Sequence, residues 1–110
     1  MAKYEKLIHG DFERVLNAVH DGIRAGSSSA SYEDGSDFEA NGIRCAVRVY
    51  ERYSMAGSNR VSMSVTLVGH GEDLFLSAIT AGGSQAVFFK MNTMGEEAFL
   101  RRLVDVVERL

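Results

Sequence analysis

The side chains with the clearest chemical potential lie in the segment IRCAVRVYERY, residues 43–53. Successive side chains of a β-strand point to opposite faces, so Arg44, Arg48, Tyr50 and Arg52 would share one face of this strand. Guanidinium groups beside an aromatic ring can neutralise phosphates and stack on single-stranded bases. These four residues therefore form a candidate anion-binding face.

A hairpin turn is predicted immediately before this strand. Asn41 and Gly42 both tolerate the positive φ angles of a type I′ turn. A two-residue loop would place Glu39 opposite Arg44 and would leave the apolar parity of the strand for the core. That apolar parity consists of Ile43, Cys45, Val47 and Val49. Extending the register backward predicts a β-bulge near DGSD, residues 34–37.

The arginine face also has a plainer interpretation as a solvated sheet surface. The acidic residues nearby are Glu33, Asp34, Asp37 and Glu39. Exposed cross-strand ion pairs contribute about 0.2–1 kcal/mol each and require no ligand. The net charge of the chain is −3, whereas a dedicated nucleic-acid-binding domain is usually basic. We therefore expect an ion-paired face without a nucleic-acid partner.

Other reactive residue types lack the spacing that catalysis or metal binding needs. His9, His20 and His70 are scattered, without an HExxH motif. Cys45 alternates with apolar residues, which is typical of a buried small side chain. We expect no catalytic, metal or cofactor-binding residue. An enzyme that uses His20 remains an alternative, and it would require a buried carboxylate beside the imidazole.

The chain has the length and composition of one domain, residues 1–110. It has 110 residues, of which 45% are hydrophobic and 25% charged, and its single cysteine excludes an internal disulfide. A short strand is predicted at 3–8. An α-helix is predicted from a cap at Asp11 to Gly26, because Phe12, Leu16, Val19 and Ile23 recur at helical spacing.

Alternating patterns then predict a run of strands and a closing helix. One strand is expected to end near residue 40. The others are expected to span 43–53, 60–68, 74–81 and, as a short last strand, AVFFK at 86–90. Thr93 and Glu96 have capping-box spacing before an apolar stripe at 99–110. The sequence therefore predicts an α+β fold: an antiparallel meander sheet of four to five strands, with an N-terminal helix and a long C-terminal amphipathic helix packed on one face.

Two binding surfaces follow from this arrangement. The space between the last helix and the sheet could hold a small apolar ligand, with a lining of Val47, Val49, Met63, Val65, Phe99 and Leu103. In the strand at 74–81 both parities are largely apolar, so both of its faces are expected to be covered. Cover on the second face indicates a homodimer.

The order of elements resembles the helix-grip arrangement of START and Bet v 1-like proteins, which implies a curved sheet around a C-terminal helix. The runs NGIRCAVRVYERYS and LFLSAITAGGSQAVFFKMNTMGEEAFL are similar to a family of small bacterial domains of unknown function, found mainly in anaerobic Gram-positive bacteria. This second resemblance implies a single domain and brings no activity with it.

The sequence shows neither a signal peptide nor a membrane span, so we expect a cytoplasmic protein. The expected function is non-catalytic binding with self-association as a homodimer. A pocket for a small hydrophobic ligand is the alternative.

Overall fold

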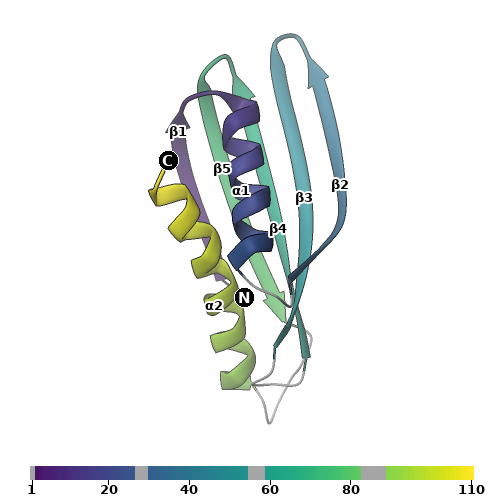
Figure 1. The fold of residues 1–110 in the computed structure, drawn as a ribbon. Coiled ribbons are helices and arrows are strands. Elements are labelled where there is room, and N and C mark those ends of the chain that lie inside the picture. Colours follow the sequence, from purple (N-terminus) through teal and green to yellow (C-terminus); the bar gives the residue numbers. More distant parts are fainter. Residues whose placement is uncertain (1, 27–29, 55–58, 83–88) are drawn as a thin grey trace.

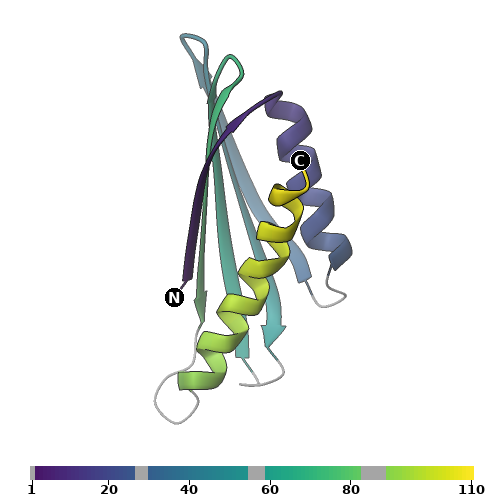
Figure 2. The ribbon, with the colours of Figure 1, turned by 90° about the vertical axis from the view of Figure 1, so that its left-hand side faces the viewer.

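The computed structural model describes residues 2–26, 30–54, 59–82 and 89–110, without the side chains of 26, 54, 59 and 89–95. The elements, in chain order, are β1 (Ala2–His9), α1 (Phe12–Gly26), β2 (Ala30–Ala40), β3 (Ile43–Ser54), β4 (Asn59–His70), β5 (Asp73–Gly82) and α2 (Phe89–Glu108). Figure 1 shows both helices in front of one sheet, and Figure 2 shows them on the same side of it.

The sheet has five antiparallel strands in the order β1-β5-β4-β3-β2. Strands β2 to β5 form a meander, and β1 occupies the edge beside β5. The prediction of an α+β fold with an antiparallel sheet and two helices is confirmed at this level. The predicted strand at 86–90 is wrong, because Phe89 already begins α2. Residues 86–88 lie outside the described residues.

The two helices are held at their ends in different ways. Asp11 caps α1 as predicted, because its Oδ2 accepts a hydrogen bond of 2.9 Å from the amide of Arg14. Helix α2 begins at Phe89, so Thr93 lies inside it and the predicted start at a capping box is wrong. Glu96 has another role: its Oε1 accepts a 2.8 Å hydrogen bond from the amide of Gly82, at the end of β5.

The predicted hairpin between β2 and β3 is confirmed. Asn41 and Gly42 have φ angles of 56° and 78°, as a type I′ turn requires. Glu39 pairs with Arg44, which is the register that the sequence predicts. The expected irregularity lies between Tyr32 and Asp34, next to the predicted segment.

The prediction of which face of β3 meets the core is wrong. Tyr50 is fully buried, and its partner across the sheet, Met63, lies in the helix-covered core. Ile43 and Tyr53, on the apolar parity, are exposed instead. An arginine has an apolar stem that can cover a core while its charged head reaches the rim, so the arginine parity can lie on the helix side.

Gly22 allows α1 and α2 to pack closely. A Cβ at this position would overlap with Cγ2 of Val106 and lie 3.1 Å from its Cγ1. Alanine normally stabilises a helix relative to glycine by about 1 kcal/mol. Here we expect Gly22→Ala to destabilise the fold by about 1–3 kcal/mol, because the β-branched Val106 cannot turn away.

Urea denaturation measures this change in the free energy of unfolding. The double variant Gly22→Ala/Val106→Ala restores space for the methyl group and should recover most of the loss relative to Val106→Ala alone. A stabilised Gly22→Ala single variant would contradict the close packing.

Candidate functional site

The helices leave one face of the sheet bare, which we call the open face (Figure 2). A continuous row of apolar side chains crosses this face. Leu7 pairs with Phe75, Phe75 with Val68, Val68 with Cys45, and Cys45 with Phe38. Directly paired residues of a sheet point to the same face. All five strands therefore contribute one residue each to this row, which we call the open-face row.

Several members of the open-face row are largely exposed. Leu7 is 80% exposed, Phe38 68% and Phe75 37%. Ile43, on the neighbouring row of the same face, is also exposed, and a depression of about 230 Å³ lies beside it. Contiguous exposed apolar side chains of this kind mark interaction surfaces in soluble proteins.

Small polar residues occupy the centre of the open face. They are Ser62, Ser64 and Thr66 on β4 and Ser77 on β5. At the far end, Arg60 Nη1 donates a 2.8 Å hydrogen bond to Glu51 Oε1 in an ion pair. A surface with short side chains at its centre allows another flat surface to approach closely.

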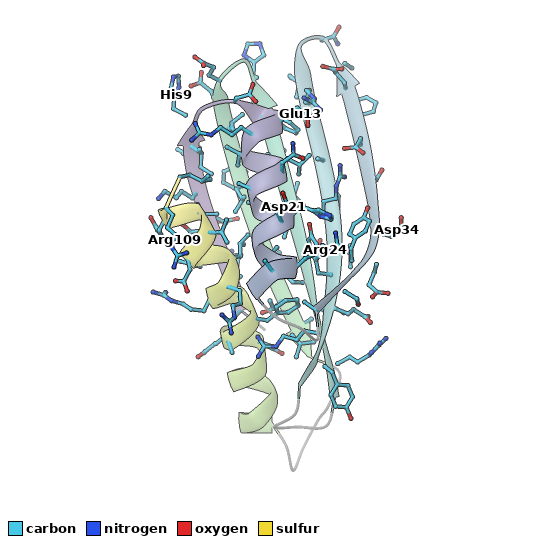
Figure 3. The ribbon with its side chains drawn as sticks, in the orientation of Figure 1. His9, Glu13, Asp21, Arg24, Asp34 and Arg109 are labelled. Carbon is cyan, nitrogen blue, oxygen red and sulfur yellow. The ribbon has the colours of Figure 1, made fainter. Side chains whose placement is uncertain are left out.

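The candidate anion-binding residues lie on the helix side, where two of them are already paired. Arg44 forms a 2.7 Å ion pair with Glu13 of α1, whose side chain Figure 3 labels, and lies 4.2 Å above the ring of Phe12. Arg48 forms a 2.9 Å ion pair with Asp37 of β2. The hydrogen bond to Glu13 raises the pKa of Arg44. These two arginines of the candidate anion-binding face are therefore already engaged by carboxylates.

Tyr50 lies beneath α1 and contacts the only histidine of that helix. Its hydroxyl is 2.8 Å from Nδ1 of His20, and the ring of Tyr32 packs edge-on against the imidazole at 5.1 Å. Burial raises the pKa of Tyr50 to about 12. The phenol therefore stays protonated at neutral pH and can donate to His20. The enzymatic alternative needs a carboxylate at this place, and among the described residues the hydrogen bond of His20 goes to Tyr50.

The predicted lining of a ligand pocket is divided between the two faces. Val47 and Val49 lie on the open face, because they pair with Thr66 and Ser64. The other four, Met63, Val65, Phe99 and Leu103, are all 1% exposed or less, beneath the helices. These four side chains belong to the buried core between the helices and the sheet.

In the described ranges, no group of three or more His, Cys, Asp or Glu residues could hold a metal ion. Neither helix combines the length and apolar character needed to cross a membrane, over the residues that the structure describes.

Sequence reasoning did not find the open-face row, because its members come from five segments. One local signal was present: Leu7 stands alone on a parity of β1 that otherwise carries Lys3, Glu5 and His9. An isolated leucine among charged residues on an edge strand indicates a contact outside the core.

Comparison with known proteins bears on the identity of the chain. None of the curated proteins and none of the solved structures matched it. A family described as a family of unknown function (DUF6054) matches over residues 1–110. The resemblance to a family of unknown function is thereby confirmed over the whole chain. The protein belongs to the DUF6054 family.

Proposed function

We propose that this protein is a non-catalytic binding domain that forms a homodimer by packing two open faces against each other. The observation that carries the proposal is the open-face row, with apolar side chains on all five strands and up to 80% exposure at Leu7. The second apolar parity of β5, which contains Phe75 and Ile79, would be covered in such a dimer. Burial of these side chains supplies the driving force.

The open face is large enough for a stable dimer. Five strands about 4.8 Å apart span roughly 24 Å, and ten residues along a strand span about 33 Å. The face of each copy is therefore on the order of 800 Å², which equals the area that each partner buries in a standard protein interface. Two sheets that pack face to face, about 10 Å apart, bury their inner side chains as in a β-sandwich.

A second copy of the chain suits this surface better than a strongly charged partner. The rim of the open face carries both signs of charge: Lys3 and Glu5 lie on β1, and the Arg60–Glu51 ion pair lies at the end of β3 and β4. In a two-fold interface the same patch meets itself, so a rim of one sign would repel its copy. A mixed rim permits opposite charges to meet.

Cys45 provides the experiment that tests this dimer, because it lies within the open-face row between Phe38 and Val68. We expect light scattering to give twice the monomer mass. We also expect the rate of thiol labelling at Cys45 to fall as protein concentration rises, since the dimer covers the sulfur. A monomer at high concentration would contradict the proposal. A dimer in which labelling is independent of concentration would place the interface elsewhere and also contradict it.

A further inference from the structure

Among the described residues, Arg52 differs from Arg44 and Arg48 in forming no ion pair with a carboxylate. Its guanidinium lies 5.9 Å from the centre of the Phe99 ring, on the helix side of the sheet. Its Nη1 atom is buried and has no hydrogen-bond partner in the described part of the chain. A buried donor without an acceptor costs free energy, and an anion beside it would remove that cost.

Helix α2 places two more arginines around Arg52. Arg101 and Arg102 lie on one face of the helix with Ala98 and Asp105, at offsets of three, four and seven residues from Ala98. Together with Arg52 they line a depression of about 230 Å³, in which the small side chain of Ala98 leaves space. We call this depression the α2 groove.

The α2 groove is strongly positive. Three guanidinium groups face one carboxylate, since Asp105 is the only acidic residue of its lining. Asp105 contacts Arg101 through Nε at 3.5 Å, in an exposed i, i+4 pair that is individually weak. Within the described ranges, no hydrogen bond or ion pair engages Arg102 or Nη1 of Arg52, so these groups can serve a ligand with several acceptor oxygens.

We propose that the α2 groove binds a phosphoryl group, either as inorganic phosphate or as the phosphate of a small metabolite. Each guanidinium group donates a pair of parallel N–H bonds that matches two oxygens of a phosphate. A carboxylate has only two oxygens, so it can satisfy fewer of the donors in the groove. The face of Phe99 holds the planar guanidinium of Arg52 beneath the groove. This site lies on the opposite side of the sheet from the open face, so it is independent of dimerisation.

Isothermal titration of the full chain with inorganic phosphate, pyrophosphate and acetate, at constant ionic strength, tests the proposal. We expect phosphate to bind and acetate to bind at least about tenfold more weakly. Tighter binding of pyrophosphate than of inorganic phosphate would identify a phosphorylated metabolite as the ligand. The reverse order would identify free phosphate. Absence of binding by both phosphate probes would overturn the proposal.

Arg102→Gln removes one exposed guanidinium of the groove, and Arg14→Gln is its matched control. Arg14 is an exposed arginine on α1, in a different depression beside Val107 and Leu110. We expect Arg102→Gln to weaken phosphate binding about tenfold and Arg14→Gln to leave it unchanged. Equal losses in both variants would indicate non-specific attraction to positive charge and would overturn the site.

Arg52→Lys tests the contribution of the Arg52 guanidinium group, because lysine keeps the positive charge and loses the paired N–H donors. Circular dichroism establishes that this variant folds. We expect about tenfold weaker phosphate binding with unchanged dimerisation, since Arg52 is absent from the open face. Wild-type affinity in a folded Arg52→Lys variant would show that the buried donor does not contact the ligand and would overturn its role.

Discussion

Replacing Leu7 and Phe38 together by glutamate is expected to convert the proposed dimer into a monomer. Both side chains are largely exposed within one chain, so the double variant should keep its fold. Each is an apolar anchor at one end of the open-face row, and loss of such an anchor costs about 2 kcal/mol of binding free energy. A symmetric dimer loses the pair from both copies, so its dissociation constant should rise by at least about 1,000-fold. Sedimentation equilibrium measures this constant directly.

Leu110→Glu is the matched control for this experiment. Leu110 is also an exposed leucine, 47% accessible, but it follows α2 and lies outside the open-face row. We expect this variant to dimerise like the wild type. If Leu110→Glu weakened the dimer as much as the double variant, the interface would involve the helices. If the double variant remained a dimer, the open-face row would not be the contact surface.

The order of elements and the turn chemistry were predictable because they depend on local sequence. Asp11 caps α1 through its own side-chain carboxylate, and Asn41-Gly42 closes the hairpin through its own backbone angles, so each acts within a few residues of the sequence. The start of α2 was not predictable in this way. The capping-box residues Thr93 and Glu96 lie inside the helix, and Glu96 accepts a hydrogen bond from Gly82 of β5. Glu96 therefore makes a hydrogen bond to a distant strand and does not form the local capping box that the sequence predicts.

The face of β3 was mispredicted for a physical reason. The alternation of residue types along β3 shows that its two faces differ in composition, but it does not show which face the helices cover. Hydrophobicity assigned Cys45 and Val47 to the core, whereas the larger Tyr50 fills it. Its partner His20 satisfies the hydroxyl, and Glu13 satisfies Arg44 at the rim. Both partners lie on α1, more than twenty residues away in sequence, so the pattern of β3 alone could not reveal them.

The same inversion explains why the candidate site could be predicted only in part. Cys45 and Val47 become surface residues, and the open-face row that includes Cys45 needs the registers of four strand pairs before it exists. Of the candidate anion-binding residues, Arg44 and Arg48 are paired and Tyr50 is buried. In the part of the chain that the structure describes, Nη1 of Arg52 has no hydrogen-bond partner. Arg101 and Arg102, which line the same depression, come from a helix some fifty residues later.

Tyr50→Ala tests the face of β3 directly, with Val49→Ala as its matched control. Tyr50 is 0% exposed and Val49 lies on the open face, so the structure predicts very different costs. Removing a fully buried aromatic ring lowers the free energy of unfolding by about 3–5 kcal/mol. Truncating the partly exposed Val49 should cost less than about 1 kcal/mol. If Val49→Ala were more destabilising than Tyr50→Ala, β3 would have the orientation that hydrophobicity alone predicts.

Urea denaturation of both variants measures these costs, in the Leu7→Glu/Phe38→Glu background so that dimerisation does not add to stability. Tyr50→Phe separates the ring from its hydroxyl. It keeps the packing and removes only the partner of His20, whose ring nitrogen then lacks a donor or acceptor, so we expect a cost of about 1–3 kcal/mol. A Tyr50→Phe variant as unstable as Tyr50→Ala would mean that the hydrogen bond, and not burial of the ring, fixes β3 beneath α1.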